Sequence, residues 1–238
     1  MKKVLYPANQ RGFNDIGWLK ANFSFSFGPY YNPEKSNFGA LRVLNDDIIA
    51  AGRGFGAHPH DNMEITTIVL KGALEHKDSM GNVGVINAGD VQVMSAGRGV
   101  THSEYNPSQK EETQSLQIWI FPKERNIQPR YDQKSFADGL VPNQLRTLIS
   151  PDRGAADTLW LNQDATFTMG TFDSAQQLDY TIKTPGNGAY VFVLEGDVKI
   201  DDAQLNKRDA IGVYDTTSFA IETNIGTSLL IIEVPMNY

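Results

Sequence analysis

Residues 52–106 read GRGFGAHPHDNMEITTIVLKGALEHKDSMGNVGVINAGDVQVMSAGRGVTHSEYN and contain every histidine of the chain. These histidines are His58, His60, His76 and His102. Two pairs of residues suited to metal binding are spaced two positions apart, His58 with His60 and His102 with Glu104. Residues two apart on a β-strand point to the same face, so each pair can direct both side chains into one interior. Two such pairs on facing strands would surround one metal ion with three imidazoles and one carboxylate.

The alternative to a metal site is that these histidines are ordinary surface or hydrogen-bonded residues. A His-x-His pair is only moderately specific, and a His-x-Glu pair is weak. The concentration of the histidines favours the metal site, because the rest of the chain has none. Three nitrogen ligands and one oxygen ligand suit iron, manganese, nickel, copper or zinc, and they leave two positions of a six-coordinate ion open for other molecules.

The composition limits the remaining chemistry and the partners. The chain has no cysteine, which excludes thiolate nucleophiles, iron–sulfur clusters and cysteine-ligated zinc. Its net charge of −7 offers no general attraction to phosphate backbones, so direct nucleic-acid binding is not expected. No apolar run is long enough to span a bilayer, and the first residues do not have the pattern of a secretion signal. A cytoplasmic location and no membrane partner are therefore expected.

Short segments rich in β-branched and aromatic residues, separated by glycine, asparagine and aspartate, predict an all-β fold of antiparallel strands. In the first half, strands are expected at residues 23–27, 41–44, 48–50, 65–70, 73–76, 83–86, 91–94 and 116–120. The Asn-Asp-Asp sequence at residues 45–47 is expected to form a tight turn between two of these strands. Further strands are expected at residues 145–149, 166–172, 189–194, 198–200, 210–214 and 228–234. The polar residues 123–144 are expected to connect a first domain, residues 1–122, to a second, residues 145–238.

Two motifs carry a resemblance to a known family. Gly52-x5-His58-x-His60-x3-Glu64-x7-Gly72 resembles the first cupin motif, and Gly89-x5-Ser95-x-Gly97 followed by His102-x3-Asn106 resembles the second. The second motif departs from the usual cupin pattern, because Ser95 stands at the proline position and two extra residues precede His102. These departures, together with the segments HPH, HSEYN, EHKDSMGN, LQIWI, FSFSFGPYY and ALRVLNDD, resemble the pirin family of bicupins.

The resemblance implies a fold, a metal and an activity. The fold would be two antiparallel β-barrels of the jelly-roll or cupin type, packed together, with metal ligands in the N-terminal barrel only. The ligands would be His58, His60, His102 and Glu104. The resemblance implies one divalent metal, with Fe(II) expected and manganese, nickel, copper, cobalt or zinc as alternatives. Bacterial pirins imply quercetin 2,3-dioxygenase activity, and animal pirins imply a role as nuclear cofactors.

Several other residues, within the stretch or shortly after it, have two readings. Glu64 could be a fifth ligand, although a hydrogen bond to a ligand histidine or to neighbouring backbone is favoured. His76 lies in a charged run, so a hairpin surface or a hydrogen bond to the site is favoured over ligation. Gln117 could support the site or be an ordinary polar strand residue. Apolar residues that could line a pocket, or simply pack in the core, are Phe55, Met63 and Ile65.

Three functional hypotheses follow. The first is a metal-dependent dioxygenase that cleaves a flavonol such as quercetin with O2. Glu104 has two possible roles in it, metal ligand and acceptor of the substrate's hydroxyl proton, and the ligand role is favoured because a carboxylate beside a cation stays ionised. The second is a metal-sensing or redox-sensing protein that regulates a partner protein by contact. The third is an isomerase or hydrolase built on the same fold, because one fold hosts many chemistries. The protein is expected to be a monomer.

Overall fold

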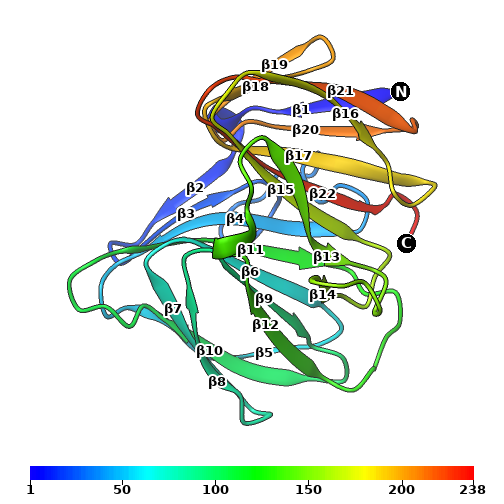
Figure 1. Cartoon of the computed structure of the whole chain (residues 1–238). Coiled ribbons are helices and arrows are strands. Elements are labelled where there is room, and N and C mark those ends of the chain that lie inside the picture. The colour runs from blue at the N-terminus through cyan, green and yellow to red at the C-terminus, as the bar shows by residue number, and fades with distance from the viewer.

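The computed structural model describes residues 1–238 and is built almost entirely of β-strands, arranged in four sheets (Figure 1). The only helical segments are two short 3-10 turns, η1 (Ala8–Gln10) and η2 (Ala137–Gly139). No helix has the length and apolar character needed to cross a membrane. Two sheets form the N-terminal half of the molecule and two form the C-terminal half, as the sequence predicts for a bicupin.

The N-terminal half pairs a seven-stranded sheet with a four-stranded sheet. The larger sheet has the order β12-β9-β6-β11-β4-β3-β2 and the smaller one the order β5-β10-β7-β8. The strands of the larger sheet are β2 (Gly12–Asp15), β3 (Leu19–Phe23), β4 (Leu41–Ile49), β6 (Glu64–Lys71), β9 (Asp90–Ser95), β11 (Thr113–Ile120) and β12 (Arg130–Ser135). The strands of the smaller sheet are β5 (Gly54–His60), β7 (Ala73–Asp78), β8 (Val83–Asn87) and β10 (Val100–Tyr105).

The C-terminal half repeats this arrangement, with the sheet orders β1-β20-β17-β22-β15-β13-β14 and β16-β21-β18-β19. Its larger sheet contains β1 (Lys2–Tyr6), β13 (Gln144–Ser150), β14 (Leu159–Trp160), β15 (Thr166–Phe172), β17 (Asn187–Glu195), β20 (Ala210–Tyr214) and β22 (Thr227–Pro235). Its smaller sheet contains β16 (Gln176–Thr181), β18 (Asp197–Ile200), β19 (Ala203–Asn206) and β21 (Ser218–Thr223). Each half is therefore a sandwich of two separately hydrogen-bonded sheets, and the predicted all-β fold of two packed cupin halves is confirmed.

Strands at both ends of the first half cross the expected domain divisions. β1 comes first in the chain but pairs with β20 of the second half, whereas β12 lies in the expected connecting segment and pairs with β9 of the first half. The division at residues 1–122, 123–144 and 145–238 stays a prediction. In the structure, β1 pairs with a strand of the other half, and β12 pairs with a strand of the first half although it lies in the expected connection.

The two halves are joined by a shared apolar core. A cluster of 27 buried residues draws its members from the two seven-stranded sheets, so these sheets pack against each other. Leu44 and Ile118 contribute from the first half, and Phe192 and Ile232 contribute from the second. Burial of one such side chain stabilises the fold by about 1.5–3 kcal/mol, which makes the joint between the halves part of the main core.

The interiors of the two sandwiches differ in character. The second half is filled by a cluster of 14 buried apolar residues. The first half has two smaller apolar clusters, of 7 and 4 residues, and the space between its sheets also receives buried histidine, glutamate, asparagine and aspartate side chains. The polar interior of the first half is therefore the place to look for chemistry.

The predicted turn at residues 45–47 is wrong. Residues 41–49 form the single strand β4, which pairs with β11 along its whole length and also with β3. Asn45, Asp46 and Asp47 are buried within this strand. Asp46 forms ion pairs with Arg11 at 3.3 Å and with Arg208 of the second half at 3.2 Å. These two arginines stabilise the buried carboxylate of Asp46, which in a turn would be exposed to water.

The strand predicted at residues 23–27 is wrong in its bounds. β3 ends at Phe23, and the following residues bend across the sandwich. Only isolated backbone contacts remain there, including the N–H of Ser24 donating to the carbonyl of Leu44 at 3.0 Å and a single bridge between Phe27 and Tyr30. This bend carries the Phe27 ring toward the polar interior, where it contacts Trp119.

Candidate metal centre

Two neighbouring strands of the four-stranded sheet position the predicted ligands. β5 carries His58 and His60, and β10 carries His102 and Glu104. The strands are antiparallel, with His102 directly opposite His58 and an irregularity of register between His102 and Glu104. β5 is an edge strand, so Pro59 between the two histidines removes no hydrogen bond from the sheet interior.

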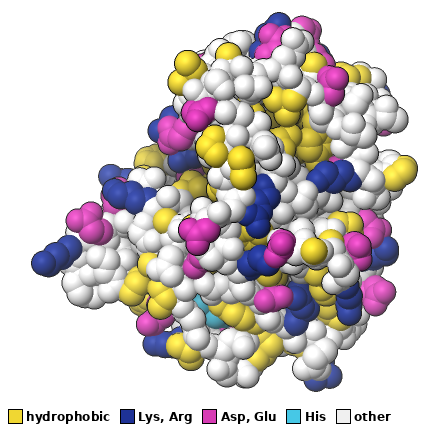
Figure 2. Space-filling view, viewed as in Figure 1, with side chains coloured by type: hydrophobic (Ala, Val, Ile, Leu, Met, Phe, Trp, Pro, Cys, Tyr) yellow, Lys and Arg dark blue, Asp and Glu magenta, His cyan; other side chains and the backbone are white.

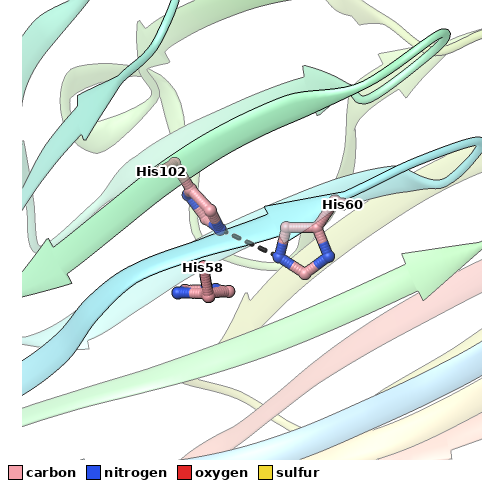
Figure 3. Close-up of side chains that lie close together, drawn as sticks. All are labelled: His58, His60 and His102. Carbon is pink, nitrogen blue, oxygen red and sulfur yellow. Dashed lines mark hydrogen bonds between the residues drawn. The ribbon is translucent and has the colours of Figure 1, made fainter.

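The rings of His58, His60 and His102 converge (Figure 3). Their candidate ligand atoms all lie within 4.8 Å of one another, and Nε2 of His60 is 3.0 Å from Nε2 of His102. The ring centroids of His58 and His102 are 4.5 Å apart, and each lies 4.9 Å from the centroid of His60. Three imidazoles that meet from two strands in this way are suited to a single transition-metal ion.

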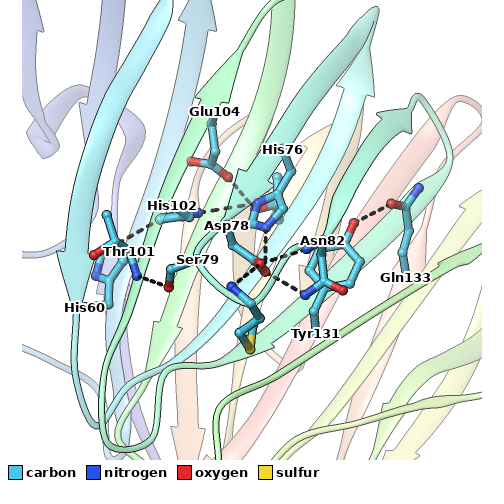
Figure 4. A network of polar contacts seen from close by, with 12 residues as sticks. His60, His76, Asp78, Ser79, Asn82, Thr101, His102, Glu104, Tyr131 and Gln133 are labelled. Carbon is cyan, nitrogen blue, oxygen red and sulfur yellow. Dashed lines mark hydrogen bonds and ion pairs between the residues drawn. The ribbon is translucent and has the colours of Figure 1, made fainter.

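Hydrogen bonds leave the inward nitrogens of two of these rings free to accept. Nδ1 of His58 lies 2.7 Å from the carbonyl oxygen of Gly56, which can only accept, so Nδ1 carries the proton and Nε2 keeps its lone pair. His102 is oriented through His76, whose Nδ1 is 3.4 Å from Nδ1 of His102. Nε2 of His76 in turn lies 3.3 Å from Oδ2 of Asp78 (Figure 4).

The carboxylate of Asp78 sets the direction of this chain of hydrogen bonds. Burial alone would raise its pKa, but hydrogen bonds from Asn82, His76 and Met80 hold the pKa of Asp78 below its usual value. An ionised Asp78 only accepts, so His76 donates from Nε2 and accepts at Nδ1 from His102. Nε2 of His102 is then left with its lone pair, as a metal ligand requires.

His60 and His102 are neutral at pH 7. Burial and the neighbouring His58 lower the pKa of His60 to about 4. Burial and the neighbouring histidines lower the pKa of His102 to about 3. Neutral imidazole is the form that binds a metal ion, so the site is prepared to receive a cation without first losing protons.

Glu104 is buried and held by two polar side chains. Its Oε2 accepts from Nε2 of Gln117 at 3.0 Å, and its Oε1 accepts from Oγ1 of Thr67 at 3.2 Å. Burial raises the pKa of Glu104. Its carboxylate belongs to a second group of close ligand atoms, formed with His76 and His102, rather than to the group of His58 and His60. His102 is the member that the two groups share.

His76 and Gln117 both take part in the site. The expected hairpin-surface position of His76 is wrong, because His76 is fully buried and the ring of Tyr131 stacks on it with the centroids 4.8 Å apart. The expected hydrogen bond from His76 to the site is present. Gln117 donates a hydrogen bond to Glu104. Of the two interpretations of Gln117 from the sequence, support of the site is therefore the correct one.

Glu64 lies outside both groups of ligand atoms. Its Oε2 accepts from Oγ of Ser95 at 2.7 Å and from the backbone N–H of Asn162 in the second half at 3.0 Å. The chain reverses between His60 and Glu64 through Asn62, whose φ is 44°, and this reversal breaks the two-residue period that would have put Glu64 beside His60. Burial raises the pKa of Glu64 to about 7.

Glu64→Gln is expected to change how stability depends on pH. Because the pKa of Glu64 is higher in the folded than in the unfolded chain, the folded protein binds more protons between about pH 4.5 and 7. The contribution of Glu64 to the free energy of unfolding therefore falls as pH rises through this window. Urea unfolding of metal-free protein at about pH 5 and 8 should show the variant gaining stability relative to the parent. A pH-independent difference, as expected for the exposed control Glu111→Gln, would contradict this.

A cavity of about 440 Å³ opens beside the converging histidines. Its aromatic lining is Trp18, Phe27, Phe55 and Trp119, and its polar lining includes Asn45, Asp47, Glu104 and Gln117. On the face drawn in Figure 2, a small area of histidine is visible in the N-terminal half, beside hydrophobic side chains. A wider hollow of about 800 Å³ lies around Arg130 and Trp160, but none of the histidines lines it.

Several cavity residues were not predicted. Phe55 lines the cavity as expected, whereas Met63 and Ile65 belong to a separate apolar cluster. Asn45 and Asp47 were not predicted to line the cavity, because asparagine and aspartate favour turns. Burial of Asp47 within the strand raises its pKa to about 8. Phe27 and Trp119 lie in the segments FSFSFGPYY and LQIWI, to which no role in the site had been assigned, and Trp18 lies in no such segment. The one available signal was the unbroken aliphatic flanks of residues 45–47, which also fit a continuous strand.

Comparison with known proteins agrees with this architecture. Residues 6–120 match the Pirin family model, and residues 147–234 match the model of the quercetinase C-terminal cupin domain. The chain is 41% identical over 232 residues to quercetin 2,3-dioxygenase of Escherichia coli (strain K12), covering 97% of this chain and 98% of the relative. It is 40% identical over 227 residues to a pirin-like protein of Caulobacter vibrioides, covering 95% and 97%.

Solved structures of a relative agree as well. The crystal structure of YhhW from Escherichia coli superposes with a TM-score of 0.93 at 38% identity and covers 100% of both chains. The structure of bacterial pirin YhhW in complex with nickel(II) gives a TM-score of 0.92 at 38% identity, covering 98% of this chain and 99% of the other. With both halves matched, and with relatives this similar over nearly their whole length, the chain belongs to the pirin family.

Proposed function

We propose that the protein is a metal-dependent dioxygenase that cleaves a flavonol such as quercetin. The observation that carries the proposal is the convergence of three imidazoles on the wall of an aromatic-lined cavity. Oxidoreductase activity of this type is also supported by the relative at 41% identity, which is named quercetin 2,3-dioxygenase.

We assign the metal ligands as His58, His60, His102 and Glu104. The nitrogens of His76 are both engaged, one with Asp78 and one with His102, so His76 is a positioning residue. Glu104 accepts hydrogen bonds from Gln117 and Thr67 only, and a carboxylate has about four acceptor positions, which leaves one for an ion. His102 links Glu104 to the other two histidines.

The donor set fits a divalent first-row metal, and Fe(II) is our expectation, with manganese, nickel, copper, cobalt or zinc as alternatives. Nickel(II) is the metal in the YhhW complex. Such an ion, when bound, supplies Lewis acidity toward the substrate and a centre for reaction with O2. With one carboxylate ligand, the net charge of the site would be about +1.

The protein's own residues would bind and orient the substrate. The rings of Trp18, Phe27 and Phe55 form flat apolar walls suited to a planar aromatic molecule. Glu104 is placed to accept the proton of a substrate hydroxyl, because its buried carboxylate lies in the lining of the same cavity. The same apolar walls exclude water from the reacting ring.

The test is turnover of quercetin by the iron-loaded protein with and without O2. Carbon monoxide and a ring-opened product are expected in air, and neither is expected under anaerobic conditions. If neither product forms in air with metal bound, the dioxygenase proposal fails and the regulatory hypothesis takes its place. Pull-down of partner proteins at two oxidation states of the metal would then test that hypothesis.

Asp78→Asn is expected to weaken metal binding by about 10–100-fold, because it removes the carboxylate that orients His76 and, through it, His102. The measurement is a competition titration against a chelator of known affinity. Glu75→Gln is the matched control, since Glu75 lies on the same strand but pairs with Lys77 near the surface. Equal metal affinity in the Asp78 variant and the parent would contradict the orienting role.

A further inference from the structure

The wall of the cavity formed by β4 carries two hydrogen-bond acceptors that nothing in the protein satisfies. Asn45 and Asp47 line the cavity and are 4% and 5% exposed, and Oδ1 of each has no hydrogen-bond partner. Nearly all buried polar atoms in proteins have a partner, so two orphan acceptors on residues that line one cavity need an explanation. Nε1 of Trp119, a donor in the same lining, is also unpartnered.

The neighbouring strands cannot supply the missing donors. Asn45 lies opposite Gln117 on β11, but the amide of Gln117 donates to Glu104. Asp47 lies between Ala21 on β3 and Ser115 on β11, and neither residue donates a side-chain hydrogen bond to it. The donors must therefore come from the cavity.

The fold does not require polar residues in this position. The corresponding interior of the second half is filled largely by a cluster of 14 apolar residues. Two adjacent inward positions of β4 have instead been kept polar beside the histidines. The residues are two apart on one strand, so both side chains point into the same space.

We propose that Asn45 and Asp47 are specificity-determining residues that form hydrogen bonds with hydroxyl groups on the ring of a planar aromatic substrate. The inference rests on the proposed function, because it assigns the recognition of that substrate within the same cavity. The histidines lie on β5 and β10 of the smaller sheet, and Asn45 and Asp47 lie on β4 of the larger one. A substrate between the sheets would meet the ligand histidines on one side and the two acceptors on the other.

The predicted substrate class is therefore an aromatic that carries two hydroxyl groups on the part directed toward β4. The surrounding rings of Trp18, Phe27 and Phe55 bind the flat apolar surface of such a molecule but cannot distinguish hydroxylated from unhydroxylated rings. Discrimination requires polar partners, because an analogue lacking the hydroxyls would leave the buried acceptors unpaired. Asn45 and Asp47 supply that discrimination.

Two flavonols test this directly. Quercetin carries two hydroxyls on its pendant phenyl ring, and galangin is the same flavonol without them. Asn45→Leu and Asp47→Leu keep the side-chain size and remove the acceptors, so each is expected to weaken quercetin binding about tenfold and to leave galangin binding within about twofold. Quenching of tryptophan fluorescence, with Trp18 and Trp119 in the cavity lining, gives the affinities of metal-free and metal-loaded protein.

Gln92→Leu is the matched control. Gln92 lies in the same cross-strand row as Thr67 and Gln117, is fully buried, and has two unpartnered amide atoms, but it is not part of the cavity lining. Its replacement is expected to leave the affinity for both flavonols within about twofold of the parent. A loss of quercetin binding in this control would show that the effect comes from general packing and would overturn the proposal.

The proposal is also overturned if the leucine variants bind both flavonols as the parent does, or lose both equally. If those variants do not fold, Asn45→Ser and Asp47→Ser shorten the side chains and give the same comparison. The proposed function fails separately: hydroxyl-dependent binding without aerobic product would remove the dioxygenase activity and keep the recognition site. Aerobic turnover of quercetin with equal affinity for the two flavonols in parent and variants would keep the dioxygenase activity and remove the recognition site.

Discussion

His102→Ala is expected to abolish stable metal binding and to lower aerobic turnover of quercetin by at least about 100-fold. His102 is the residue common to the two groups of ligand atoms, and its Nε2 faces Nε2 of His60 at 3.0 Å. Loss of a residue that only orients a ligand costs about 10–100-fold in metal affinity or activity, so loss of the ligand itself should cost at least the upper value. Elemental analysis after dialysis and a turnover assay measure the two effects.

Thr101→Ala is the matched control for this experiment. Thr101 precedes His102 on the same strand, and its side chain is exposed on the opposite face. The control should therefore keep its metal and its activity. Full metal content in His102→Ala would mean that the ion is held elsewhere. The hydrogen bonds that link Asp78, His76 and His102 would then have only a structural role.

Glu104→Gln is expected to lower metal affinity about tenfold and turnover by about 100-fold or more. Glutamine keeps the size of the side chain but removes its negative charge and its ability to take up a proton. A positioned general base contributes about 10²–10⁴-fold to rate, so turnover should fall further than metal content alone explains. Metal titration followed by assay at saturating metal separates the two contributions.

The outcomes for Glu104 divide its two proposed roles. Full metal affinity with lost turnover would leave the proton-accepting role and remove the ligand role. Full affinity together with full turnover would show that Glu104 is a buried structural carboxylate held by Gln117 and Thr67. Glu112→Gln removes a carboxylate that pairs with Lys71 at the surface, and it should change neither quantity.

The histidine pairs could be predicted from sequence because the relevant geometry is local. A two-residue spacing on any strand puts both rings on one face, whatever the rest of the fold does. β5 and β10 realise that spacing, and their pairing brings His58 opposite His102. The sequence could not show that the two strands are immediate neighbours in one sheet, because pairing is decided by contacts between distant segments.

Residues 45–47 could not be assigned correctly from local preference. Asparagine and aspartate favour turns because their side chains bond nearby backbone when water is the alternative. In this protein, Asp46 has Arg11 and Arg208 as partners, and its neighbours face a cavity. Those partners come from distant parts of the chain. Asn45 and Asp47, which line the cavity, were therefore predicted wrongly from local residue preference.

His76 shows the same limit. Its neighbours Glu75 and Lys77 pair with each other near the surface, and this charged run suggested exposure. The ring of Tyr131 covers His76 from β12, a strand in the segment expected to be a polar connection. A residue that alternates with exposed charges can still be buried when a distant strand covers its face.

The pairing of β1 with β20 has a consequence for the order in which the protein assembles. Tyr6 lies opposite Ala210, and the backbone N–H of Ala8 donates to the side chain of Asp209 at 2.7 Å, so the residues of β1 find their partners only after β20 has been synthesised. Contacts so distant in sequence slow folding. Because β1 precedes the strands of the N-terminal half in the sequence, a ribosome-bound N-terminal half would hold an unpaired strand until the second half emerges, which makes the two halves one unit of folding.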